Sequence, residues 1–356
     1  MTDSMMLGDP VGLAAESVTQ KKKPSRLGFL LRRLGFYLLT FWTALTLNFL
    51  LPRLMPGDPT AATIRQLEQA SGGPLPPGTR EAILRMFGDP RKGIWDQYVT
   101  YLGQLAHGNL GISVIRYPEP VVDVLAQALP WSLALIGFST AIAWVLGLGT
   151  GIGLGWRQGK LADAIITPAM TVVSVIPDFW IAIVFLYLFA FTIPLFPAAG
   201  GYDPTVPYEF SFNFLVHALP YAALPVLTLI VASFAGWVFQ MRNMMVTTLG
   251  EDYTLLARAK GLRDSTVMFR YGARNALLPS VTALALQAPA LITGAVFVES
   301  VFSYPGMGYY FTQAVARRDF PTMQAIFLLT ILLTLVANFV ADSLYAVLDP
   351  RTRKRS

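Results

Sequence analysis

Six long stretches of this chain are almost free of charged residues, and they restrict the folds it can adopt. They cover residues 34–52, 124–156, 164–202, 210–241, 275–298 and 320–341, and the one charge among them is Asp178. A helix needs roughly 20 apolar residues to cross the hydrocarbon core of a bilayer. A charge at its centre costs about 2.5–3.5 kcal/mol. Charged residues make up only 13% of the chain, about half the share usual in soluble proteins. We therefore predict an all-α integral membrane protein with six membrane helices, at 34–52, 129–155, 164–193, 215–240, 277–298 and 322–346.

The lysines and arginines predict the orientation of these helices. Eighteen of the 27 fall in residues 1–33, in the segments after the second and fourth helices, and in the C-terminal tail. Cytoplasmic segments carry the excess of Lys and Arg, so both termini are expected in the cytoplasm. The expected parts are a cytoplasmic tail at 1–33, a first span at 34–52 and an extracellular loop domain at 53–127. A core follows at 129–346, with a cytoplasmic loop at 242–276, and a cytoplasmic tail closes the chain at 347–356. The first apolar stretch begins too late, and is too long, to be a cleaved signal peptide.

Several kinds of site are excluded by the residues that are missing. The chain has no cysteine, which removes disulfides, thiolate metal sites and cysteine nucleophiles. His107 and His217 are far apart in sequence and lack the spacing of metal ligands. The segment 155–160 resembles a phosphate-binding loop only faintly, because its glycines are wrongly spaced and no Ser or Thr follows Lys160. We expect no cofactor in this chain and no nucleic acid as a partner.

The most informative segment is the cytoplasmic stretch 251–279. Its first part has acids at the start and Arg258 and Lys260 at the end, which suits the dipole of a short helix. Gly261 fits a left-handed cap at the end of that helix. Asp264 or Ser265 fits the N-cap of a second one. Taken alone, the segment is also compatible with an ordinary interfacial hairpin.

Motifs spread over residues 30–351 resemble those of ABC importer permeases of the peptide/nickel family, in the form of the first permease with a long loop after helix 1. The cytoplasmic segment ARAKGL (257–262), followed by RNALLP (274–279), resembles the family's coupling motif. The others are PGDP (56–59), GNLGIS (108–113), IPDFW (176–180), ESVFSYPGMG (299–308) and LDPR (348–351). Asp178 departs from the family pattern, which often has Ser at that position.

The resemblance implies a type I importer permease fold and a non-catalytic subunit of an ATP-driven importer. The implied partners are a second homologous permease, two ABC ATPase subunits that hold ATP and Mg, an extracellular substrate-binding protein and the lipid bilayer. The implied location is the plasma membrane of a bacterium or archaeon. Peptides are the expected substrate, with oligosaccharides or nickel chelates as alternatives. The residues expected to couple the chain to the ATPase are Glu251, Tyr253, Ala257, Arg258, Ala259, Lys260, Gly261, Leu262, Arg274 and Asn275, with Ala257 on the docking face.

Polar residues in or near the apolar stretches are candidates for the translocation path, because intramembrane charges usually face a bundle interior or a water-filled cavity. Asp178 either meets the amino end of a peptide or stabilises a helix kinked at Pro177. Glu299 either touches substrate or anchors the turn that follows it. Gln240 and Arg242 are expected to end the fourth helix, where they line a gate or mark the membrane interface. Asp342 is expected to pair with a basic residue.

Two other classes of function remain as alternatives. A proton-coupled secondary transporter would use Asp178 and Glu299 as proton carriers. It would show paired broken spans in two related halves, and no such symmetry is visible. An intramembrane hydrolase would need a reactive pair at one depth. His217 has no evident partner, and Asp178 and Asp342 are expected at different depths.

Overall fold

The computed structural model describes residues 26–54, 59–87, 92–209, 211–281, 283–284 and 295–348. These residues are helical or form turns and loops, apart from an isolated bridge between Ile112 and Pro120. Four helices are long and apolar enough to cross a membrane: α1 (Arg26–Leu54), α5 (Val121–Trp156), α8 (Phe212–Leu249) and α14 (Phe320–Leu348). A fifth candidate is the pair α6 (Leu161–Val175) and α7 (Asp178–Leu186), which continues into the π-helical turn η1 (Tyr187–Thr192). The predicted helical membrane protein is confirmed to this extent.

The predicted span at 277–298 lies largely outside the described residues. Helical backbone is described at 274–281 and 283–284, and again in α12 (Val296–Val301). The span at 277–298, and with it the total of six spans, therefore stays a prediction. The cytoplasmic position of both termini also stays a prediction. The pairing predicted for Asp342 concerns a side chain outside the described part.

Several predicted boundaries are wrong, because helices continue beyond their most apolar stretch. Helix α1 begins at Arg26, and α5 begins at Val121 rather than 129. Helix α8 runs to Leu249, so Gln240 and Arg242 lie inside it and the first part of the predicted loop 242–276 is helical. Ser211 accepts a hydrogen bond from the Phe214 N–H at the start of α8, as an N-cap does. Gly250 follows at its end.

The structure has the kink at Pro177 that one of the two alternatives for Asp178 assumed, and it is a full break between two helices. Helix α6 ends at Val175, α7 begins at Asp178, and the two are bent by 94°. The residue before a proline is disfavoured in helical conformation, and Ile176 is extended accordingly. Two helices replace the single helix predicted at 164–193.

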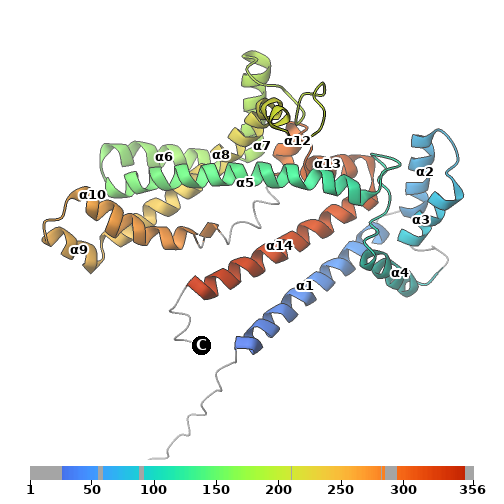
Figure 1. The fold of residues 1–356 in the computed structure, drawn as a ribbon, viewed down its shortest axis with the longest axis horizontal. Coiled ribbons are helices and arrows are strands. Elements are labelled where there is room, and N and C mark those ends of the chain that lie inside the picture. The colour runs from blue at the N-terminus through green and yellow to red at the C-terminus, as the bar shows by residue number, and fades with distance from the viewer. Residues whose placement is uncertain are drawn as a thin grey trace, which may run out of the picture.

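The long helices lie in two groups (Figure 1). Helix α5 lies along α8, with α6 beside them, and this contact between α5 and α8 is the most extensive one in the described chain. Helices α1 and α14 lie side by side below them. The segment formed by α12 and α13 (Met307–Arg317) joins the groups because α13 contacts both α5 and α14. The short segments α9 (Asp252–Ala259), α10 (Asp264–Thr266) and η2 (Val267–Ala273) lie at one end of the molecule.

A row of glycines lets α5 and α8 approach closely. Gly147, Gly151 and Gly155 recur every four residues on one face of α5, and a Cβ on any of them would collide with Trp237, Met241 or Met245 respectively. Gly149 and Gly153 on the same helix have nothing within 4 Å of such a Cβ. Small residues spaced by four allow this backbone approach between membrane helices.

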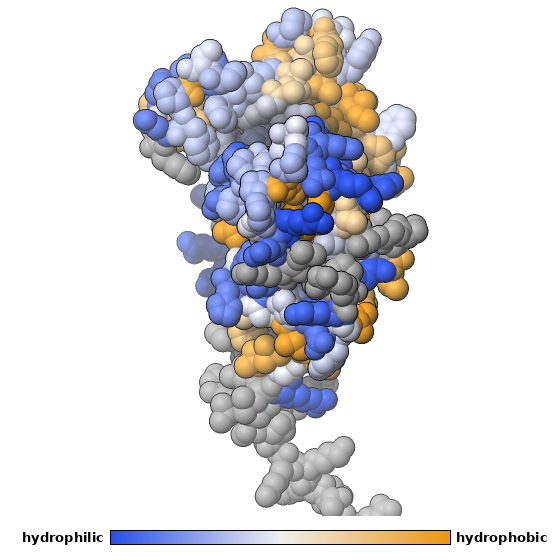
Figure 2. Space-filling view, turned by 90° about the vertical axis from the view of Figure 1, so that its right-hand side faces the viewer, coloured by the Kyte–Doolittle hydropathy of each residue, from blue (hydrophilic) through white to orange (hydrophobic). Residues whose placement is uncertain are grey.

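The end of the molecule opposite α9 carries three short helices, where an extracellular domain was predicted. They are α2 (Pro59–Ser71), α3 (Pro77–Phe87) and α4 (Ile94–Ala106). Figure 2 faces this end, where hydrophilic residues prevail over much of the surface. Its small core contains Leu67, Leu75 and Ile83, packed against Phe320 at the start of α14.

Candidate functional site

Helix α9 is held firmly on its inner face. Thr254 is fully buried, and its hydroxyl donates to the carbonyl oxygen of Thr248 at 2.9 Å, which ties α9 to the end of α8. Ala257 is only 2% exposed. The guanidinium of Arg258 lies 5.3 Å from the ring centre of Trp156, the last residue of α5, within the range of a cation–π contact. Helix α9 therefore contacts the ends of both α5 and α8.

Gly261 makes the turn after α9 and has φ +71°, as predicted. The Leu262 N–H donates to the Ala257 carbonyl at 3.3 Å, and the Gly261 N–H donates to the Arg258 carbonyl at 2.9 Å. These two bonds are the pattern of a Schellman motif, in which a left-handed residue satisfies the last carbonyls of a helix. The residue in the N-cap position of α10 is Arg263, so the prediction of Asp264 or Ser265 is wrong by one or two positions.

The return segment packs under the same helix end. Val267 and Ala273 of η2 are buried, and Ala273 and Ala276 join Leu148, Met241 and Met245 in one apolar cluster. Asn275 donates from Nδ2 to the Tyr271 carbonyl, and Arg274 is exposed. The cytoplasmic segment is thus fastened to α5 and α8 by apolar contact as well as by hydrogen bonds.

The outer face of α9 is apolar and open. Tyr253, Leu255 and Leu256 are 40%, 51% and 56% exposed, and Leu262 beside them is also exposed. Glu251, Asp252, Ala259 and Lys260 are exposed as well. Ala257 points the other way, into the protein, so its predicted place on the docking face is wrong. We call the four residues Tyr253, Leu255, Leu256 and Leu262 the α9 surface.

Comparison with known proteins identifies the family. Residues 147–354, more than half of the chain, match the family described as "Binding-protein-dependent transport system inner membrane component". The chain belongs to this family. This permease match includes α6 to α9 and the glycine row, which places the segments described above within the shared part of the family.

Curated relatives of this permease match over almost their full length. The oligopeptide transport system permease protein AppB of Bacillus subtilis is 33% identical over 308 residues, which are 86% of this chain and 92% of the relative. The dipeptide transport system permease protein DppB of Lactococcus lactis is 33% identical over 326 residues, covering 91% and 99%. DppB of Escherichia coli K12 is 31% identical over 350 residues, covering 92% and 99%.

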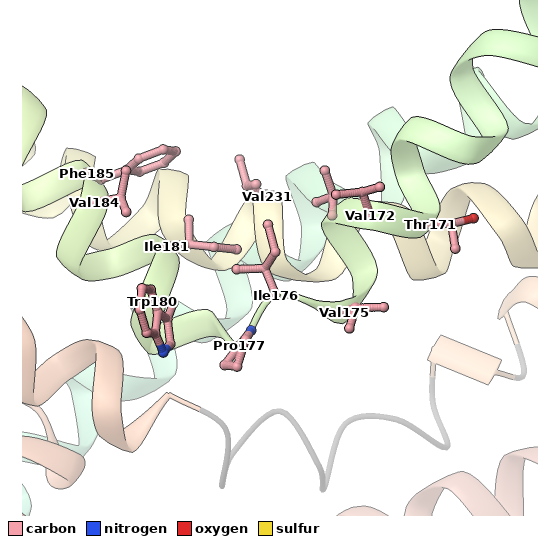
Figure 3. A pocket seen from close by; sticks show the side chains of 11 residues that line it. Thr171, Val172, Val175, Ile176, Pro177, Trp180, Ile181, Val184, Phe185 and Val231 are labelled. Carbon is pink, nitrogen blue, oxygen red and sulfur yellow. The ribbon is translucent and has the colours of Figure 1, made fainter.

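An apolar cavity of about 880 Å³ lies at the break between α6 and α7. Val172 and Val175 line it from α6, Trp180 and Ile181 from α7, and Val231 from α8 (Figure 3). Asp178 lies beside this cavity but is not among its lining residues. Its Oδ1 accepts from the Phe179 N–H at 2.7 Å, and no ion pair with it is found among the described residues.

The other predicted path residues of the permease do not share that cavity. Glu299 is 1% exposed and accepts from the Ser132 hydroxyl at 2.6 Å and from the Gly308 N–H at 2.7 Å. Glu299 therefore ties α12 to α5 and to the first turn of α13. This is the arrangement expected if Glu299 anchors the turn that follows it. Gln240 is half-buried in α8, and its Oε1 has no hydrogen-bond partner among the described residues. The guanidinium of Arg242 is bound to Asp163 of α6.

Two buried acids were not singled out from the sequence. Asp163 binds Arg242, the Gly159 N–H and the Thr167 hydroxyl. Asp319 is fully buried and caps α14, accepting from the Thr322 N–H at 3.1 Å. It also accepts from the Ser113 hydroxyl and two backbone N–H groups after it. Asp319 directly precedes the apolar stretch 320–341. An Asp in that position is a sequence signal for the N-cap of a helix.

The end that carries α2, α3 and α4 is joined to the long helices by a second polar contact. Asn48 of α1 and Gln324 of α14 exchange hydrogen bonds with each other's backbone carbonyls at 2.9 and 2.7 Å. Asn48 also donates to the Tyr101 hydroxyl of α4 at 3.3 Å. Burial raises the pKa of Tyr101 to about 12. Such side-chain bonds commonly fix helix pairs in membranes.

Proposed function

We propose that this chain is the membrane-spanning subunit of an ATP-driven importer and forms the translocation path for peptides with a second permease. The proposal adds two ABC ATPase subunits, which hold ATP and Mg, and an extracellular substrate-binding protein. The chain itself catalyses no reaction in this account. Its place is the plasma membrane of a bacterium or archaeon, with six spans and both termini in the cytoplasm.

The observation that carries the proposal is the combination of an open apolar face and a fastened inner face on α9. A short amphipathic helix that presents apolar side chains can dock into a groove on a partner. An exposed apolar cluster rimmed by charges is typical of an interaction site. Because the inner face is bonded to α8 and stacked on α5, force applied to the α9 surface reaches the membrane helices.

The curated relatives support the peptide substrate, since their names describe oligopeptide and dipeptide transport. Oligosaccharides and nickel chelates remain alternative substrates for the same architecture. Family membership favours an ATP-driven importer over a proton-coupled transporter. The arrangement of Glu299, whose two oxygens are engaged by Ser132 and Gly308, supports an anchoring role over proton carriage.

Reconstitution tests the proposal. The chain would be assembled with its second permease and ATPases in proteoliposomes, and uptake of a labelled peptide would be measured with the loaded binding protein outside. We expect uptake that needs ATP inside and the binding protein outside. Competition by unlabelled peptides, but not by oligosaccharides or nickel chelates, assigns the substrate. Uptake that follows a proton gradient without ATP would contradict the proposal.

A further inference from the structure

The ion pair between Asp163 of α6 and Arg242 of α8 joins two residues that are 79 positions apart in the sequence. Nε of Arg242 donates to Oδ1 of Asp163 at 2.6 Å, and Nη2 donates to Oδ2 at 2.7 Å. The two parallel bonds use the planar fork of the guanidinium, which fixes orientation as well as distance. Solvent reaches only 18% of the Arg242 side chain and 7% of the Asp163 side chain.

Asp163 accepts hydrogen bonds from two further groups besides Arg242. It accepts from the Gly159 N–H at 3.0 Å, in the turn between α5 and α6, and from the Thr167 hydroxyl at 2.8 Å, one turn further along α6. Gly159 has φ +75°, so this turn has a conformation that glycine adopts easily. The carboxylate therefore connects the α5–α6 turn, the first turns of α6, and α8.

This connection matters for α6 because no apolar side chain of that helix is buried in the described part of the chain. Asp163 is the one buried residue of α6 in the described part of the chain. The apolar residues of α6 remain open or half-open, and its contacts with α8 are far more extensive than those with α5. The position of the beginning of α6 is therefore set by Arg242 more than by apolar packing.

Arg242 stands on the part of α8 that leads to the α9 surface. Leu249 lies seven positions further along the helix, a distance of about 10 Å. Thr254 then fastens α9 to Thr248. On the other side of the pair, α6 runs to the break at Pro177 and the apolar cavity beside it. The pair thus lies between the α9 surface and the broken helix.

We propose that Asp163 and Arg242 act as positioning residues that transmit movement of α9 and the end of α8 to α6, and so to the break at Pro177. The inference rests on the proposed function, since it assigns a route for the force that an ATPase applies to the α9 surface. Neither side chain touches substrate in this account. With the pair intact, α6 follows α8; with the pair removed, α8 can move while α6 lags behind.

The test compares single and double neutral variants in the reconstituted complex. Asp163→Asn and Arg242→Gln each leave one buried charge without its partner, which destabilises a fold strongly. The double variant removes both charges, so it is expected to assemble. Arg242→Lys keeps the charge but loses the fork. Arg157→Gln removes an exposed charge at the same α5–α6 turn and serves as the matched control.

The deciding readout is peptide imported per ATP hydrolysed, measured together with the ATPase stoichiometry of the purified complex. We expect normal ATPase content in the double variant, with import per ATP reduced about fivefold or more, the lower range of measured coupling between sites. Arg242→Lys should fall between the double variant and wild type. Arg157→Gln should match wild type.

Two results would overturn the inference. A wild-type import ratio in the double variant would show that the pair transmits nothing. Failure of the double variant to assemble would assign the pair to folding alone. Absence of ATP-driven import by the wild-type complex would instead contradict the proposed function, so the two failures can be told apart.

Discussion

Replacing Gly151 with alanine tests whether close approach of α5 and α8 holds the core together. A Cβ at this position would lie 2.7 Å from Met241 Cβ, 2.8 Å from the Val238 carbonyl oxygen and 3.0 Å from the Arg242 nitrogen. Gly153, two residues further along the same helix, has nothing within 4 Å of an added Cβ. Gly151→Ala and Gly153→Ala therefore make the same chemical change in the same helix. Only Gly151→Ala adds a methyl group that collides with α8.

The magnitude follows from these distances. Carbon atoms pack best at about 3.5–4.0 Å, so α5 and α8 would have to separate by roughly 1 Å to accept the Gly151 methyl group. Overpacking of this kind costs about 1–3 kcal/mol. Glycine to alanine within a helix gains about 1 kcal/mol in both variants, and this gain cancels in the comparison. We expect Gly151→Ala to be about 1–3 kcal/mol less stable than Gly153→Ala.

The assay is unfolding of the purified chain in mixed micelles with increasing denaturing detergent, followed by the midpoint and slope of the transition. Gly153→Ala should unfold at or above the wild-type midpoint, and Gly151→Ala below it. Gly155 and Gly149 provide a second matched pair, because a Cβ on Gly155 would lie 2.5 Å from Met245 Cβ while Gly149 is open. Equal midpoints within each pair would refute the packing argument.

Three further predictions concern other parts of the chain. In this cysteine-free chain, Ser71→Cys should react with an impermeant thiol reagent in intact cells and Ser265→Cys should not, and the reverse pattern would contradict the orientation. Asp178→Asn should weaken transport of free peptides more than transport of N-acetylated ones. The apparent affinity for free peptides should fall roughly tenfold, because loss of a charged hydrogen-bond partner costs about 1.5–3 kcal/mol. Equal losses for both kinds of peptide would favour a structural role for Asp178. Asp319→Asn should lower the free energy of unfolding by a similar amount, because the buried carboxylate accepts several bonds, and an unchanged unfolding midpoint would contradict that assignment.

The sequence could predict the features that depend on local composition. Long charge-free stretches located the helices α1, α5, α8 and α14 because the cost of burying charge in lipid is large. Pro177 located the break in the third span, and Gly261 located the turn after α9, since each residue restricts or frees the backbone in a specific way. The angle of 94° at the break was not predictable from Pro177 alone.

Features that depend on tertiary contact were missed. Arg242 was considered without a partner and Asp163 was not singled out, because nothing local shows that residues 79 positions apart will form a pair. Ala257 was placed on the wrong face of α9 because an eight-residue helix with Leu255, Leu256 and Ala257 in succession has an ambiguous apolar phase. The spacing of Gly147, Gly151 and Gly155 was visible as a packing signal, but it does not name the partner helix.

The most direct test of the central proposal is ATPase docking on the α9 surface. Leu256→Glu places a charge on this surface, and Gly261→Val strains the left-handed turn by roughly 1–2 kcal/mol. Ile94→Glu, at another exposed apolar residue on the opposite end of the molecule, is the matched control. The measurement is ATPase stoichiometry in the purified complex, with hydrolysis stimulated by the loaded binding protein. We expect both α9 variants to retain the second permease but to lose ATPase and stimulation, with Ile94→Glu keeping its ATPase subunits. Normal docking and stimulation in both α9 variants would contradict the proposed coupling.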